Sequence, residues 1–167
     1  MSRANQFFLK FIGLKDGSHK FEYDLDNSFF ISHDYLDFNS CDIKVKIELV
    51  KKTTVLELYI IGIGLVNINC TLSNEPFDFE VNSKMKLLLK FGDKYDDSND
   101  ELIILPHGSH TVELDQFLYE MIVLSMPIRN VHPGIDDGSL KSDILNRLKD
   151  FDINKEKSSN FDPRWDK

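Results

Sequence analysis

The chain has 167 residues, of which 41% are hydrophobic and 29% charged, a composition that predicts one packed globular domain and excludes a disordered chain. Its formal net charge of −8 disfavours nucleic-acid binding over the whole surface and favours basic protein partners. The two cysteines, the lack of a membrane-spanning apolar run and the lack of a signal-peptide pattern predict a cytoplasmic protein with no disulfide framework.

Two alternating runs near the N-terminus predict a β-hairpin. The residues of Phe7–Ile12 and of Lys20–Leu25 alternate in type, and Asp16-Gly17 between them suits a turn that needs positive φ. The segment Asp26–His33 then predicts a short helical connection that starts at an Asp or Asn cap.

The centre of the chain predicts an antiparallel meander, because three consecutive runs have apolar residues at a period of two. These runs cover residues 41–49, 56–70 and 77–91. If Lys51-Lys52 is a two-residue turn, Ile47 lies opposite Leu56 and Cys41 lies opposite Gly62, and the apolar faces of the strands coincide.

The other side of the middle run is also apolar, with Tyr59, Ile61, Ile63 and Leu65. A sheet face of this kind is too apolar to be left in water, so we expect the helix predicted over Leu114–Met126 to cover part of it. The sequence therefore predicts an α+β fold, an antiparallel β-meander or partly closed barrel with one packed amphipathic helix.

The last third of the chain predicts smaller elements. Asp93–Glu101 reads as an acidic loop, Glu101–Leu105 as one more strand, and Leu140–Phe151 as a helical stretch. We expect residues 1–150 to form a single domain and residues 151–167 to form a charged C-terminal tail.

No catalytic or metal-binding constellation is evident. Gly62-Ile63-Gly64 lies inside a predicted strand and lacks the third glycine of a nucleotide fingerprint, so it indicates a bend or close packing. His107 and His110 are too few ligands for a metal, and Cys41 and Cys70 fall on apolar strand faces. We therefore expect no enzyme activity, no cofactor, no metal and no small-molecule substrate.

The polar side of the predicted meander offers one binding constellation. In the predicted register Lys46 and Lys90 flank Glu57, while Lys44 and Leu88 flank Tyr59. Such residues can hold a phosphate backbone and stack a base, although strand lysines also commonly protect sheet edges from pairing. The candidate RNA-binding residues are Lys44, Lys46, Tyr59, Lys86 and Lys90.

Short landmarks in a fixed order resemble the YceD family of large ribosomal RNA subunit accumulation proteins, over nearly the whole chain. The closing Asp162–Asp166 is similar to that of Bacteroidetes-type members. The landmarks are Phe11–Gly17, Phe21–Asp26 with Phe29-Phe30, the long strand that closes on Cys70, Leu87–Gly92, the acidic loop, Leu124–Pro127, Arg129, His132-Pro133 and Asp162–Asp166.

The resemblance implies a non-enzymatic bacterial ribosome-biogenesis factor that binds large-subunit rRNA precursor or a ribosomal protein. Many family members carry a Cys-x-x-Cys, which suggests zinc in them. Here the matching positions are Cys70 and Ser73, and residues 138–146 contain no cysteine, so we expect no zinc. The alternative is a protein–protein adaptor without RNA contact that docks through Arg164 and Trp165 of the tail.

Overall fold

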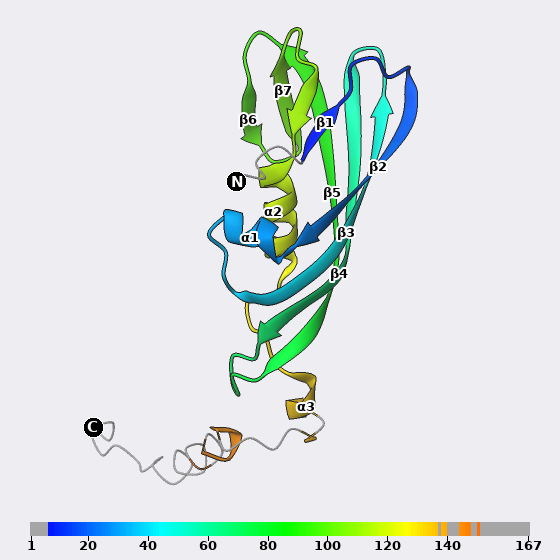
Figure 1. Cartoon of the computed structure of the whole chain (residues 1–167). Helices are drawn as coiled ribbons and strands as arrows, with labels where there is room; N and C mark the ends of the chain where they lie inside the picture. The colour runs from blue at the N-terminus through cyan, green and yellow to red at the C-terminus, as the bar shows by residue number, and fades with distance from the viewer. Residues whose placement is uncertain (1–6, 137, 140–143, 148–149, 151–167) are drawn as a thin grey trace, which may run out of the picture. The chain divides into compact units, whose positions relative to one another are not determined.

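The computed structural model describes residues 7–136, 138–139, 144–147 and 150 (Figure 1). The chain divides into two compact units, Met1–Ile68 with Asp78–Ile128, and Asn69–Phe77 with Arg129–Lys167. The single domain over residues 1–150 stays a prediction, and the charged tail from residue 151 lies outside the described residues.

The fold is α+β, as predicted, and its main sheet has six strands in the order β2-β3-β4-β5-β7-β6. The sheet is open, with β2 and β6 at its edges, so the meander forms and a barrel does not. The elements are β1 (Phe8–Lys10), β2 (Gly17–Asp26), α1 (Asn27–Ser32), β3 (Phe38–Lys51), β4 (Val55–Asn69), β5 (Pro76–Gly92), β6 (Asp96–Asn99), β7 (Leu102–Pro106), β8 (Thr111–Glu113), α2 (Asp115–Ser125) and α3 (Pro133–Asp136).

The predicted N-terminal hairpin is wrong, because its two strands belong to different sheets. The first strand, β1, pairs with β8 and sets Leu9 opposite Val112, while β2 pairs with β3 and sets Tyr23 opposite Val45. The expectation of a residue with positive φ at Asp16-Gly17 is nevertheless confirmed, since Gly17 has a φ of 132°. A period of two identifies a strand but not its partner, and here each strand buries its apolar side against a distant segment.

The predicted helical connection is confirmed as α1. The carboxylate of Asp26 accepts a hydrogen bond from the Phe29 N–H at 3.2 Å, as an N-cap does. Phe29 and Phe30 are buried, and the Phe30 ring lies edge-on to Phe38 of β3 at 4.9 Å between centroids. This aromatic contact fixes the short helix to the sheet.

The register of β3 on β4 differs from the prediction by four residues. Ile47 lies opposite Ile60, and Lys51 lies opposite Leu56. The turn lies two residues further along the chain than predicted, at Thr53-Thr54, since Lys52 N–H donates to the carbonyl of Val55 at 3.0 Å. A shift of four residues keeps each side chain on its own face, so the predicted apolar faces still coincide.

The amphipathic helix is confirmed as α2, but it covers the opposite side of β4 from the one predicted. At Gly62 an added Cβ would lie 2.9 Å from Cδ1 of Ile122 on α2. We call this side of the sheet, with Leu58 and Ile60, the inner face; Figure 1 shows α1 and α2 on it. On the other side of β4, Ile63 is 54% exposed.

The segment predicted as an acidic loop contains a strand. Within it, β6 pairs with β7 and sets Asp96 opposite Ile104. The predicted strand over 101–105 is confirmed as β7, which runs parallel to β5. Of the predicted C-terminal helical stretch, residues 144–147 are helical, and residues 140–143, 148–149 and 151 lie outside the described residues.

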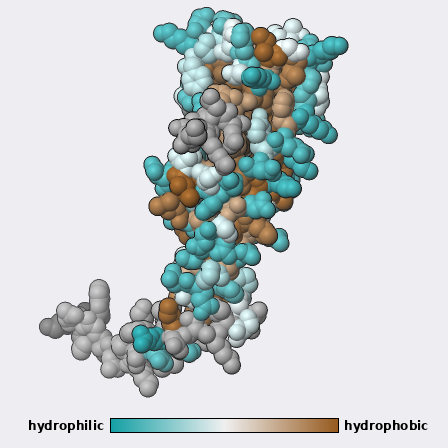
Figure 2. Space-filling model, viewed as in Figure 1, coloured by the Kyte–Doolittle hydropathy of each residue, from teal (hydrophilic) through white to brown (hydrophobic). Residues whose placement is uncertain are grey.

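The core of the first unit lies between the inner face of the sheet and the helices. It contains fully buried side chains from β3, β4, β5 and α2, among them Ile43, Leu58, Leu89 and Leu118. The side shown in Figure 2 is mainly hydrophilic with separate apolar patches. In the described part of the chain no helix has the length and apolar character to cross a bilayer.

Candidate nucleic-acid interface

The outer face of the sheet is the side of β3, β4 and β5 that points away from α2. Its centre is apolar, because the exposed side chains Tyr59, Ile63 and Leu65 follow one another along β4. Exposed lysines flank this row on both neighbouring strands, so charge surrounds an apolar centre. The lysines are Lys44 and Lys46 on β3 and Lys84, Lys86 and Lys90 on β5.

The shifted register changes which lysine lies beside which central residue. Lys44 lies opposite Ile63 and Lys46 opposite Ile61, so the prediction that Lys44 and Lys46 flank Tyr59 and Glu57 is wrong. On β5 it is Lys86, not Leu88, that lies beside Tyr59, with Nζ 5.2 Å from the ring centroid. The predicted residues therefore share one face but follow the whole length of the apolar row.

Tyr59 is held in a small network rather than left free. Its hydroxyl donates to the Glu57 carboxylate at 3.0 Å, and the ammonium of Lys52 donates to the same carboxylate at 2.7 Å. The hydrogen bond from Lys52 is the main cause that lowers the pKa of Glu57, followed by the one from Tyr59. Because Lys86 covers one side of the ring, a base can stack on Tyr59 only from the other side or in place of Lys86.

The lysines differ in their acidic neighbours. Across the ladder from β3, Lys44 lies opposite Asp24, and Lys46 lies opposite Glu22. On β5, Lys90 lies opposite Ile104, which carries no charge. Carboxylates directly opposite partly neutralise the β3 lysines, whereas Lys90 has no carboxylate directly opposite it on β7.

Comparison of the chain with models of known protein families shows which family it resembles. A model described as "Large ribosomal RNA subunit accumulation protein YceD" matches residues 63–167, more than half of the chain. The chain belongs to the YceD family. This membership links it to the accumulation of large-subunit ribosomal RNA. None of the curated proteins and none of the solved structures that were compared matches the chain significantly.

The region matched to the YceD family contains only part of the candidate interface. Lys86 and Lys90 lie inside it, whereas Lys44, Lys46 and Tyr59 precede it. The two tail candidates, Arg164 and Trp165, lie inside the matched region but outside the described residues.

In the second unit, this YceD-family chain shows a feature that the sequence analysis missed, a Cys70 thiol surrounded by donors. Its sulfur accepts hydrogen bonds from the backbone N–H groups of Leu72, Ser73 and His132 at 3.3 to 3.5 Å. Burial opposes ionisation of the thiol, but the hydrogen bonds, led by those of Ser73, lower the pKa of Cys70 to about 7. Burial and nearby carboxylates instead raise the pKa of Cys41 to about 12. The turn that follows Cys70 is the only signal the sequence could have given.

No metal centre is evident among the residues that the structure describes, since no three His, Cys, Asp or Glu side chains gather there as ligands. Cys70 is only 2% exposed and Ser73, three residues further along, is also buried. The Ser73 hydroxyl instead accepts a hydrogen bond from the Glu75 N–H at 3.4 Å. Hydrogen bonds therefore organise this turn in the described structure.

A second surface of the first unit has the opposite charge. A cavity of about 540 Å³ beside α2 is lined by carboxylates and by apolar side chains that include Tyr95 and Phe117. Its carboxylates and aromatic rings suit a basic side chain, which could contact both together. The carboxylates are those of Asp97, Asp100, Glu113, Asp115 and Glu120.

Proposed function

We propose that this YceD-family protein is a non-enzymatic, cytoplasmic ribosome-biogenesis factor that binds unpaired segments of large-subunit rRNA precursor on the outer face of its sheet. One observation carries the proposal, the exposed apolar row of β4 between lysines of β3 and β5. Lysines on both sides can bind phosphates while bases pack on the row between them.

The charge of the whole chain supports a localised contact. With a net charge of −8, the remaining surface repels RNA, so an RNA strand is favoured only where lysines gather. Single-stranded RNA suits this face better than a duplex, because unpaired bases can pack against Tyr59, Ile63 and Leu65. The carboxylates opposite Lys44 and Lys46 leave β5 as the stronger side of the interface.

The test is the affinity for segments of rRNA precursor, measured by fluorescence anisotropy over a range of salt concentrations. The test variant changes Lys44, Lys46, Lys86 and Lys90 to Gln. The control variant removes the same charge by changing four exposed basic residues outside the strands of the main sheet to Gln. These are Lys10, Lys15, Lys94 and Arg129.

We expect the test variant to bind RNA more weakly and with a shallower salt dependence. For single-stranded RNA the slope should fall by roughly 0.7 for each lysine–phosphate ion pair that the substitutions remove. The control should keep most of the affinity. Equal affinities of wild type and test variant, or equal reductions in both variants, would show that the outer face does not bind the RNA.

A second candidate partner is a basic ribosomal protein, and the acidic cavity beside α2 favours it. Affinity purification from the native bacterium at two salt concentrations, with RNA and protein both identified, separates the candidates. Asp97→Asn with Glu120→Gln should release a ribosomal protein that docks in the cavity and leave RNA bound. Deletion of residues 160–167 tests the tail adaptor in the same assay, since it should release protein partners only.

A further inference from the structure

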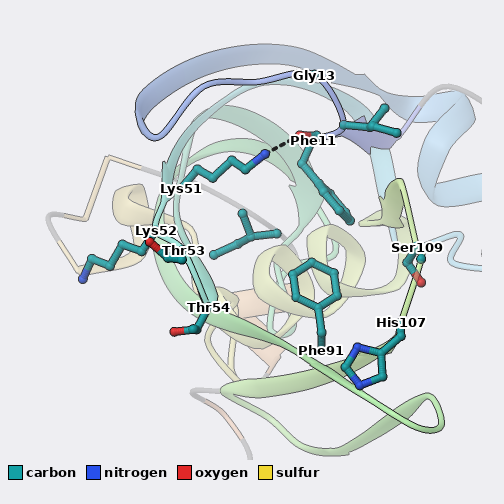
Figure 3. Close-up of a pocket in the computed structure, with 12 residues that line it drawn as sticks. Phe11, Gly13, Lys51, Lys52, Thr53, Thr54, Phe91, His107 and Ser109 are labelled. Carbon is teal, nitrogen blue, oxygen red and sulfur yellow. Dashed lines mark hydrogen bonds between the residues drawn. The ribbon is translucent and has the colours of Figure 1, made fainter.

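A pocket of about 580 Å³ lies at one end of the sheet in the first unit, where four segments of the chain meet (Figure 3). The segment after β1, the β3–β4 connection, the end of β5 and the β7–β8 loop all contribute to its walls. This volume falls within the range of small-ligand sites in proteins. None of the predicted functional residues lines the pocket.

The lining is basic in an acidic protein. None of the described residues that form the pocket is acidic, whereas Lys51, Lys52 and His107 all belong to it. Lys52 is neutralised by Glu57 at 2.7 Å. The Lys51 ammonium instead donates to the carbonyls of Leu14 at 2.9 Å and Phe11 at 3.4 Å, and within the described residues it has no carboxylate partner. The two carbonyls hold a positive charge at the pocket wall, which favours an anion.

The floor of the pocket is aromatic. The rings of Phe11 and Phe91 meet edge to face, 5.9 Å apart at an angle of 60°, and Leu56 of β4 also lines the pocket. Figure 3 shows both rings directed into the pocket, with the Lys51 side chain reaching toward Phe11 above them. A flat ring can pack on this floor, chiefly on Phe91 because Phe11 is only 4% exposed, and the hydroxyls of Thr53 and Thr54 can bond its edge.

Contacts connect the pocket to the outer face. Lys52 lines the pocket and binds Glu57, Glu57 accepts the Tyr59 hydroxyl, and Lys86 lies on the Tyr59 ring. A strand of RNA on the outer face can therefore pass from the lysines of β5 to the pocket along continuous polar contacts. This continuity favours an occupant of the pocket that is part of the RNA strand on the outer face.

We infer that the pocket binds one nucleoside phosphate, with its base on Phe11 and Phe91 and its phosphate at Lys51 and His107. The inference rests on the proposed function where the nucleotide is part of a bound RNA strand. The same chemistry also fits a free mononucleotide, so the experiment tests both sources separately. The combination of an anion site and an aromatic floor favours this class over an aliphatic acid.

The experiment uses the full chain and two probes, the free mononucleotides AMP and UMP and a short single-stranded oligoribonucleotide of mixed sequence. Binding is measured by calorimetry, and the site by chemical-shift changes of backbone amides at Gly13 and Gly108, which line the pocket. The variants are Lys51→Gln and His107→Gln, with Lys94→Gln and His110→Gln as controls that remove the same groups outside the pocket. His110 follows His107 in the same loop and does not line the pocket.

We expect the mononucleotides to shift the pocket amides and Lys51→Gln to weaken their binding about tenfold, the effect of removing one charge-assisted hydrogen bond. His107→Gln should weaken it less, and both controls should bind as the wild type does. A thermal melt of each variant separates weaker binding from failure to fold, because a variant with an unchanged melting temperature has kept its pocket.

The outcomes separate this inference from the proposed function. If the oligoribonucleotide binds but neither probe shifts the pocket amides, or if Lys51→Gln binds both as the wild type does, the pocket inference is overturned and the outer face remains. If mononucleotides bind in the pocket and the oligoribonucleotide does not bind, the pocket inference holds and RNA binding is overturned. If neither probe binds, both are overturned.

Discussion

The two faces of β4 are similar in sequence and opposite in environment. On the inner face Leu58 and Ile60 are at most 1% exposed, whereas on the outer face Ile63 and Leu65 are 54% and 48% exposed. The inner face has Gly62, where an added Cβ would lie 2.9 Å from the end of the Ile122 side chain of α2. Hydrophobicity alone therefore does not decide which side of a strand is covered; the space for a helix does.

On the outer face no described helix packs on the apolar row, and Tyr59, Ile63 and Leu65 are all exposed. An exposed apolar row on a sheet, bordered by charged residues, is typical of a surface that binds a partner. The residues of the inner face thus stabilise the fold, whereas those of the outer face are available for binding. Each prediction below tests that division.

The largest effect is expected at Gly64, on the inner side of β4. A Cβ at Gly64 would lie 2.1 Å from the backbone oxygen of Asp42, so Gly64→Ala requires the backbone of β3 to move. We expect a loss of more than about 4 kcal/mol or failure to fold. Gly62→Ala should cost less, about 1–3 kcal/mol, because its Cβ meets the ends of the Ile122 and Met121 side chains, which can shift. Urea unfolding measures both, and equal costs would contradict the rigid contact at Gly64.

A matched pair of leucines on β4 tests the two faces directly. Leu58→Ala removes a fully buried side chain and should lower the free energy of unfolding by about 2–5 kcal/mol. Leu65→Ala makes the same change on the outer face, where the side chain is 48% exposed, and should cost much less. Chemical denaturation of the two variants gives the difference. Similar losses would mean that the outer face is covered after all.

The sequence predicted where the helices and strands lie better than it predicted which elements contact one another. Periodicity identified the strands of the meander and α2, because an apolar side of a strand or helix repeats at a fixed interval, and the Asp26 cap identified α1. It could not locate the β3–β4 turn, since Lys51, Lys52, Thr53 and Thr54 are all polar and a shift of four residues leaves the faces unchanged.

The side of β4 that the helix covers was also beyond periodicity, because both sides are apolar. The signal lay in Gly62, for which the sequence indicated a bend or close packing; the structure shows close packing against side chains of α2. The candidate lysines were placed on the correct face but beside the wrong neighbours, and the donors around Cys70 could not be predicted because one of them, His132, comes from a distant segment.

A smaller effect is expected for the contact between Lys86 and Tyr59 on the outer face. A double-mutant cycle with Lys86→Gln and Tyr59→Leu should give a coupling energy of about 0.5–1 kcal/mol, as for an exposed cation–π pair. The pair is exposed, so the measurement is the free energy of unfolding of four proteins at low salt. A coupling energy near zero would mean that Lys86 can bind a phosphate without losing a stabilising contact with the Tyr59 ring.

The smallest effect on stability is expected for Ile63→Thr at the centre of the outer face. Threonine keeps the β-branched shape that suits a strand, and the side chain is already 54% exposed, so the free energy of unfolding should change by no more than about 0.5 kcal/mol. The affinity for unpaired RNA should nevertheless fall several-fold, because a base no longer packs on an apolar side chain between the lysines. The matched control is Ile31→Thr on α1, which is 50% exposed and lies away from the outer face. Unchanged RNA affinity with Ile63→Thr would leave the row without a role in RNA binding, and a large loss of stability would show that Ile63 is part of the core.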